Sequence, residues 1–173
     1  SPQMEEFGRL ARASFEREMV SHLAAFSPAL YRTLGAERML AAVQVGVTRA
    51  GKHGFTFRGP VRLYLETMLL LGSHFDSDPQ YPWAKAILAS TDGAGQLQRA
   101  ERLYEGLMDY RRRVTGSNDE YAIAALKRIA LIAGQSLDTL QPDFMGNIFR
   151  LIGHVYPQKL AYLGREPLEA LAR

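Results

Sequence analysis

The sequence contains no cysteine among its 173 residues. This absence excludes disulfide bonds, thiolate metal sites and cysteine nucleophiles, and it fits a reducing compartment. A chain of this length can bury a substantial hydrophobic core without such cross-links. We therefore expect one domain that spans residues 1–173 and resides in the cytoplasm.

Long apolar runs are also missing. The longest strongly apolar run, Met68 to Leu71, is far below the roughly 20 residues that are needed to cross a bilayer. The first twenty residues carry glutamates at positions 5, 6, 16 and 18, which is not typical of a signal peptide. We expect no transmembrane helix and no membrane partner.

Neither sign of charge dominates. The chain has 21 Lys and Arg against 18 Asp and Glu, a formal net charge of +3, with both signs mixed along its length. The one recognisable basic cluster, Arg111 to Arg113, is surrounded by acidic residues. A nucleic-acid-binding surface would need a broader basic patch, so nucleic acid is not an expected partner.

Common catalytic motifs are absent. The chain has no GxSxG elbow and no HExxH motif, and its four histidines fall in different predicted elements: His22, His53, His74 and His154. Residues 46–53 match a phosphate-binding loop except that His53 replaces the Ser or Thr that would hold magnesium, and a helix precedes it instead of a strand. We interpret this segment as the cation-rich end of a helix. The sequence predicts no enzyme activity and no cofactor.

Helical periodicity runs through most of the chain. Apolar residues recur every four positions near the start, at Phe7, Ala11, Phe15, Met19 and Leu23, which predicts an amphipathic helix. Segment 60–71 begins with proline and is apolar almost all round, so it predicts a central buried helix. Ser117 and Glu120 form a capping-box pattern ahead of another helix.

Proline and glycine mark where the helices are expected to begin and end. The expected starts are Pro28, Pro60, Pro142 and Pro157, and the expected ends are Gly35, Gly54 and Gly134. A last short turn is expected over Pro167–Ala172. No segment alternates as a clean strand, and the nearest candidate, Phe55–Phe57, is too short to form a sheet. We predict an all-α single-domain bundle of about seven to nine helices around the helix near 60–71.

Residues 72–83, Gly-Ser-His-Phe-Asp-Ser-Asp-Pro-Gln-Tyr-Pro-Trp, depart furthest from helix composition. His74, Asp76 and Asp78 could present an imidazole and two carboxylates to a cation. This spacing is permissive, and the favoured interpretation is that an aspartate caps a helix or turn while Phe75 packs inward. We expect no metal site. A metal-assisted enzyme or a small-ligand-binding helical protein centred on this loop is the alternative function.

The aromatic end of the same loop favours protein binding. Tyr81 and Trp83, rigidified by Pro82, are residue types that dominate interface energetics when they are exposed. A single tryptophan beside a short helix is, however, more often half-buried in its own domain. The expected partner-binding residues are His74, Asp76, Asp78, Tyr81 and Trp83.

Several strings together carry a resemblance to a known group of proteins. They are Gly54 to Thr56, Tyr64 to Gly72, Phe75 to Ala84, Gly116 to Arg128, Tyr156 to Leu160, and Leu163 with Gly164. They cover most of the chain, and Phe-Asp-x-Asp-Pro-x-x-Pro-Trp is the most distinctive of them. The chain resembles small all-helical proteins of type VI secretion and polymorphic-toxin gene clusters of Gram-negative bacteria. This group has no catalytic motif to carry over.

The resemblance implies a cytoplasmic accessory protein that binds a co-encoded effector, toxin or secretion component. It could act as an adaptor, a loading chaperone or an immunity protein, and these three roles stay open. Inhibitors of basic nucleases are commonly acidic, so that the two potentials are complementary. The slightly basic charge of this chain favours an adaptor over an inhibitor of a nuclease.

Overall fold

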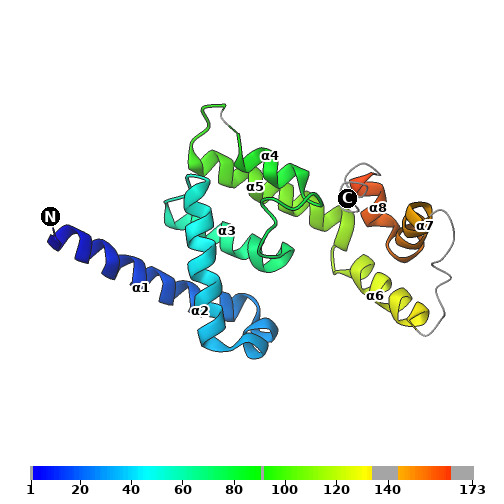
Figure 1. The fold of residues 1–173 in the computed structure, drawn as a ribbon, viewed down its shortest axis with the longest axis horizontal. Helices are drawn as coiled ribbons and strands as arrows, with labels where there is room; N and C mark the ends of the chain where they lie inside the picture. The colour runs from blue at the N-terminus through cyan, green and yellow to red at the C-terminus, as the bar shows by residue number, and fades with distance from the viewer. Residues whose placement is uncertain (1, 91, 134–143, 165–173) are drawn as a thin grey trace. The chain divides into compact units, whose positions relative to one another are not determined.

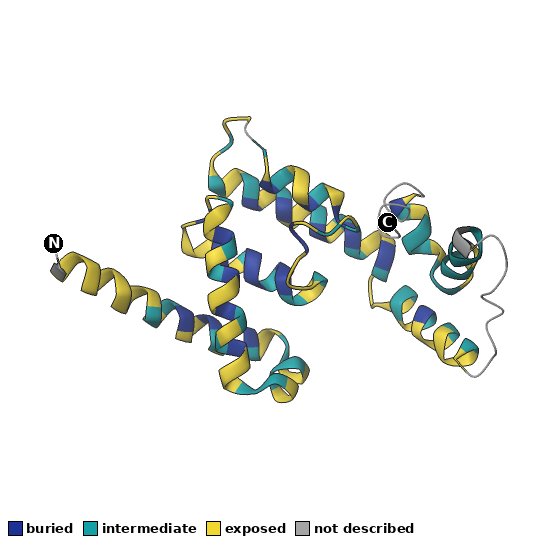
Figure 2. Cartoon of the chain, viewed as in Figure 1, coloured by how far each residue is buried: buried dark blue, intermediate teal, exposed yellow. Residues whose placement is uncertain are grey.

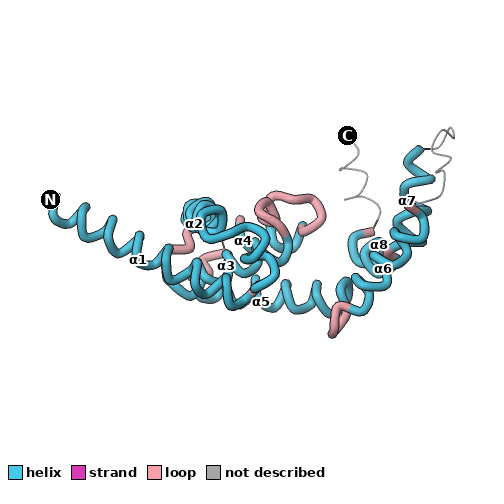
Figure 3. The backbone as a smooth tube through the Cα atoms, turned by 90° about the horizontal axis from the view of Figure 1, so that it is seen from below, coloured by secondary structure: helices cyan, strands magenta, loops and turns pink. Residues whose placement is uncertain are grey.

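The computed structural model describes residues 2–90, 92–133 and 144–164 (Figure 1). Within these ranges the chain forms eight α-helices and a π-helical turn, and no strand (Figure 3). The predicted all-α class is therefore confirmed. No helix in the described part of the chain is long and apolar enough to cross a membrane.

The elements follow one another along the chain in this order. They are α1 (Pro2–Phe26), α2 (Pro28–Lys52), α3 (Arg58–Leu71), α4 (Pro82–Leu88), α5 (Gln96–Tyr110), the π-helix η1 (Arg111–Thr115), α6 (Glu120–Ile132), α7 (Phe144–Val155) and α8 (Pro157–Leu163). Pro28 and Pro157 begin helices as predicted. Gly35 breaks α2 with a φ of 78°, a left-handed value that glycine adopts without steric cost. The predicted helix end at Gly134, the start at Pro142 and the turn over Pro167–Ala172 lie outside the described residues.

The chain divides into two compact units. Unit 1 comprises residues 1–75 and 87–101, and unit 2 comprises residues 76–86 and 102–173. The boundaries fall in the 72–83 loop, inside α4 and inside α5. The expectation of a single domain over residues 1–173 stays a prediction, and each unit is described by itself.

The core of unit 1 forms around α3, where α1 and α2 pack together and against it. Six residues of α3 are buried: Pro60, Val61, Tyr64, Leu65, Thr67 and Met68 (Figure 2). The buried hydroxyl of Thr67 donates to the Leu63 carbonyl at 2.8 Å, which satisfies its hydrogen-bonding need. Gly46 of α2 lies so close to Leu65 that a Cβ at this position would overlap its side chain. The apolar character of segment 60–71 thus correctly predicted a buried helix.

Only part of α1 contributes to this core. Met19 and Leu23 are buried, Phe15 is half-buried, and residues 3–12 are exposed (Figure 2). The first half of α1 extends beyond α2 and α3 (Figures 1 and 3). The apolar stripe that predicted the helix is therefore longer than the part of α1 that packs against these helices.

Unit 2 is built from the first part of α4, the later part of α5, η1 and the helices α6 to α8. Leu103, Leu107 and Val114 are buried, and the Tyr156 hydroxyl donates to the Val114 carbonyl at 2.8 Å. The predicted capping box at Ser117 and Glu120 is wrong. The N-cap position of α6 is occupied by Asp119, and its side chain accepts no hydrogen bond from the backbone of the helix. The Glu120 carboxylate instead accepts from the Asn118 N–H at 2.8 Å.

Candidate functional site

The 72–83 loop places its polar residues in different environments. His74 is exposed and its Nδ1 lies 3.0 Å from the Ser73 hydroxyl. Asp76 is buried and accepts from the Ser77 hydroxyl at 3.2 Å. Asp78 accepts from the Gln80 N–H at 2.8 Å, which confirms the predicted turn-capping role of an aspartate.

Phe75 confirms the inward-packing prediction. Its side chain is buried, and its ring centroid lies 4.9 Å from that of Tyr64. At this separation the tilted rings make a favourable aromatic pair. Much of the unusual composition of the loop therefore serves folding.

Metal coordination has no geometric support at this loop. No group of three or more His, Asp or Glu side chains in the described ranges is arranged to hold a metal ion. The contacts of His74 with Ser73 and of Asp78 with Gln80 turn these side chains to local partners.

Tyr81 lies inside an aromatic cluster of unit 2. It is 7% exposed and packs edge-on against Tyr110 at 5.3 Å, and Tyr110 packs in the same way against Tyr162. Burial raises the pKa of all three phenols. Because Tyr81 has almost no free surface, it supports neighbouring residues more directly than it could contact a partner.

Trp83 is half-buried in its own unit, as expected for a single tryptophan beside a short helix. Its indole lies against Gly106 of α5, where a Cβ would come within 2.5 Å of the ring. Its ring centroid is 6.4 Å from that of Tyr110. The missing side chain at position 106 therefore allows the indole to lie close to α5.

The remaining surface of Trp83 lines a groove of about 530 Å³ in unit 2. The other lining residues come from α4, α5, η1 and α8: Pro82, Asp109, Arg113, Gln158, Ala161 and Tyr162. Apart from Pro82, sequence reasoning missed these residues because they meet only when distant helices pack. The one sequence signal for this groove is the basic run Arg111 to Arg113, which is too narrow for a nucleic-acid surface.

Arg113 and Asp109 are the charged residues among those that line the groove, and Arg112 pairs with Asp109 from outside it. Asp109 Oδ1 lies 2.6 Å from Arg112 Nη2 and 3.1 Å from Arg113 Nε. Two guanidinium groups thus share one carboxylate, which leaves one positive charge in excess. The side chain of Arg113 is 61% exposed, and its contact with Asp109 uses Nε.

Two polar atoms in the lining residues are buried without a hydrogen-bond partner in the described chain: Trp83 Nε1 and Gln158 Oε1. One is a donor and the other an acceptor. An unsatisfied buried polar group costs about 1–3 kcal/mol. Both atoms are themselves covered, so only a ligand that displaces the covering side chains could supply the missing acceptor and donor.

The π-helix positions Arg113. Gly116 donates its N–H to the Arg111 carbonyl at 2.9 Å, a five-residue step that widens the turn after α5. π-helical turns are rare in proteins, and those that occur are often found at functional sites. Val114 of this turn is buried while Arg112 and Arg113 remain exposed, so the turn is anchored on one side and presents arginines on the other.

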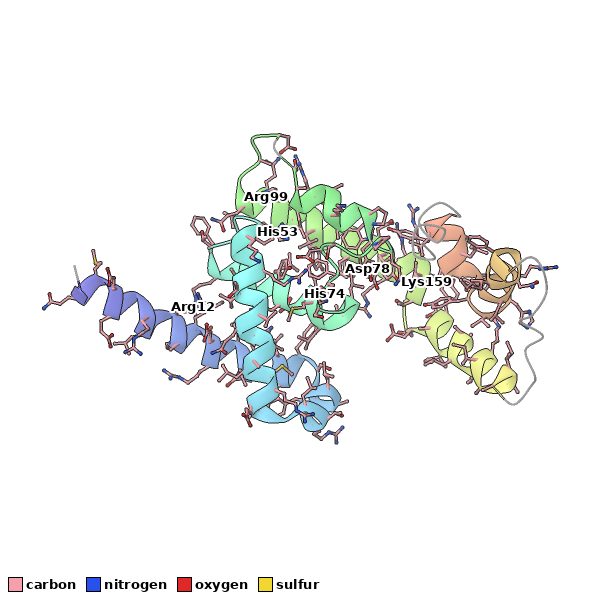
Figure 4. The ribbon with its side chains drawn as sticks, in the orientation of Figure 1. Arg12, His53, His74, Asp78, Arg99 and Lys159 are labelled. Carbon is pink, nitrogen blue, oxygen red and sulfur yellow. The ribbon has the colours of Figure 1, made fainter. Side chains whose placement is uncertain are left out.

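Lys159 of α8 follows the groove residue Gln158 in the chain. Burial lowers the pKa of Lys159, and the Asp78 carboxylate opposes this effect (Figure 4). The protonated amine is therefore less stable here than in water.

A second groove of similar volume lies along α5 and η1. It is lined by Tyr104, Met108, Arg111 and Arg112 among others. None of its lining residues has a buried polar atom without a partner in the described ranges. The groove beside Trp83 is for this reason the stronger candidate site.

Large apolar side chains also remain exposed on α6. They are Ile123, Leu126, Ile129 and Leu131. Contiguous exposed apolar surface is typical of interaction sites, although these side chains alone do not indicate what covers them.

Comparison of the chain with protein-family models, curated proteins and solved structures finds no significant match.

Proposed function

We propose that this chain is an interaction protein that binds another protein through the groove beside Trp83. The observation that carries the proposal is the combination of an aromatic wall, an arginine whose carboxylate is shared with a second arginine, and two lining residues with unpaired buried polar atoms. Tryptophan, tyrosine and arginine are the residue types most enriched in interface hot spots. Trp83, Tyr162 and Arg113 supply one of each.

The resemblance provides the biological context of this proposal. We place the protein as a cytoplasmic accessory of a type VI secretion or toxin system whose partner is a co-encoded effector, toxin or secretion component. The net charge of +3 favours an adaptor or loading chaperone over an inhibitor of a basic nuclease. An immunity role against a toxin with an acidic or apolar face is the third possibility.

The contact set differs from the five residues expected from sequence. Trp83 stays at its centre, whereas Tyr81 and Asp76 are buried and act by supporting the loop. Arg113, Gln158 and Tyr162 take their place. His74 and Asp78 stay predicted contacts at the edge of the loop.

The experiment is co-purification with tagged products of the neighbouring genes through size exclusion. Ala161 lines the groove and is exposed, so Ala161→Gln fills the groove without removing a core side chain. Ala86→Gln is the matched control, because Ala86 is exposed on α4 and does not line the groove. We expect wild type and Ala86→Gln to co-elute with a partner and Ala161→Gln to lose it, with unchanged helicity by circular dichroism.

Two results would contradict the proposal. If no neighbouring gene product co-elutes with wild type, the interaction function is wrong, and a groove of this volume would instead fit a small ligand. If a partner is captured equally well by Ala161→Gln, the interaction stands but the groove is not its site.

A further inference from the structure

We infer that the groove beside Trp83 recognises an extended peptide segment that carries an apolar residue next to an acidic side chain. This inference rests on the proposed function and names the chemistry of the partner. It combines three features: the sharing of one carboxylate by Arg113 and Arg112, the unpaired polar atoms of two lining residues, and the aromatic surface of the groove. Each feature selects a different part of the segment.

The acidic side chain follows from the charge balance at Arg113. Arg112 and Arg113 share the single carboxylate of Asp109, so one positive charge is not neutralised. Because Arg113 contacts Asp109 through Nε, that ion pair leaves its two terminal amino groups unused. A guanidinium edge of this kind binds a carboxylate through two parallel hydrogen bonds. The charge of Asp109 opposes the ligand only weakly, because two arginines already compensate it.

The peptide backbone follows from the two unpaired atoms. Trp83 Nε1 needs an acceptor and Gln158 Oε1 needs a donor, and a peptide unit carries one carbonyl and one N–H. Both atoms lie beneath the surface, so small side-chain rotations must open them to the ligand. The binding of a peptide would then satisfy both groups at once.

The apolar residue follows from the wall of the groove. Trp83, Tyr162, Ala161 and Pro82 supply aromatic and aliphatic surface. The volume of about 530 Å³ is in the range of small-ligand sites, which fits a short segment and not a folded element. Because the groove is open to solvent, a segment within a chain can enter it, and no chain end is required.

The test uses the fluorescence of Trp83, which is the single tryptophan of the chain. The full chain is titrated with acetyl-Leu-Glu-amide and, as a neutral probe of equal size, acetyl-Leu-Gln-amide. We expect a saturable change in Trp83 emission and about tenfold tighter binding of the glutamate probe, since hydrogen bonds to charged groups are stronger. Added salt should weaken the glutamate probe more than the neutral one.

Variants assign the selectivity to Arg113. Arg113→Gln should reduce the affinity for the glutamate probe to that for the neutral probe, and Arg113→Lys should retain only part of the preference because lysine cannot form the planar pair. Arg38→Gln is the matched control, because Arg38 is an exposed arginine of unit 1. It should leave both affinities unchanged.

Several results would overturn the inference. They are no saturable change with either probe, equal affinity for the two probes, or an unchanged preference in Arg113→Gln. Tighter binding of acetyl-Leu-Gln with a free carboxyl terminus would also overturn it, because the groove would then select a chain end.

Failure of this inference can be distinguished from failure of the proposed function. Capture of a co-encoded partner by wild type and Arg113→Gln alike would leave the interaction function intact and reject the acidic segment. Selective binding of the glutamate probe without any co-encoded partner would support the groove chemistry and reject the proposed function.

Discussion

Trp83 shows how a single small residue can create a site. Gly106 leaves room for the indole against α5, and the indole in turn forms a wall of the groove. Glycine inside a helix is ordinarily a cost of about 0.5–1 kcal/mol relative to alanine. At position 106 this cost is offset by the packing of an aromatic ring.

We predict that Gly106→Ala lowers the free energy of unfolding by about 1–3 kcal/mol, in the range of overpacking substitutions. The added Cβ would lie 2.5 Å from a rigid ring atom of Trp83, so the indole must move. Gly8→Ala is the control, because nothing lies within 4 Å of its added Cβ and the helix should gain stability. Chemical denaturation followed by circular dichroism measures both. A stabilised Gly106→Ala would mean that the indole does not lie against α5.

Lys159 gives a second prediction at a single residue. Burial lowers its pKa in the folded state, so the folded chain binds fewer protons than the unfolded chain between the folded pKa and the unfolded value near 10.4. Lys159 therefore destabilises the fold at neutral pH, and this effect fades as the pH rises through that window. Lys159→Met should be more stable than wild type at pH 7. A less stable variant would show that the attraction of Asp78 outweighs burial.

At the scale of the element, periodicity predicted where helices form but not which of their faces are covered. The apolar stripe of α1 identified the helix, yet its first half is exposed, and Phe7 is 72% exposed. The reason is physical, because a spacing of three or four residues fixes a helical face while its burial depends on the length and placement of neighbours. The same limit applies to α6.

We predict that exposed apolar residues of α6 contribute little to the stability of the isolated chain. Leu126 is 65% exposed whereas Leu103 of α5 is fully buried. Leu126→Ala should change the free energy of unfolding by no more than about 0.5 kcal/mol, and Leu103→Ala should lower it by about 2–5 kcal/mol. Denaturant titration of both variants measures this contrast. Equal losses would mean that α6 is covered in solution.

The packing of the 72–83 loop, α5 and α8 around three tyrosines predicts a response to alkaline pH. Burial raises the pKa of Tyr81, Tyr110 and Tyr162 above their value near 10. The folded chain then keeps protons that the unfolded chain loses, so this contribution is complete below pH 10 and is lost as the pH rises toward the folded pKa.

The measurement is thermal unfolding between pH 8 and 11. Stability should fall above about pH 10, and Tyr110→Phe should reduce the fall because one of the perturbed phenols is removed. A fall of the same size in Tyr110→Phe would contradict the assignment to this cluster.

For the whole molecule, composition and periodicity were enough for the fold class. Helix starts at Pro28 and Pro157, the break at Gly35 and the buried helix around Leu65 all followed from local signals. The functional site followed only in part. Trp83 was identified by its residue type. Arg113 and Gln158 join it in the groove only through packing between helices that are distant in sequence, and local sequence patterns do not predict such packing.

The affinity of this chain for its captured partner tests the central claim most directly. We would measure it by calorimetry for wild type, Ala161→Gln and Ala86→Gln. The groove account predicts binding at least about tenfold weaker for Ala161→Gln, a difference of about 1.4 kcal/mol, and no change for Ala86→Gln. Equal affinity of all three proteins would show that the partner binds elsewhere and would contradict the account.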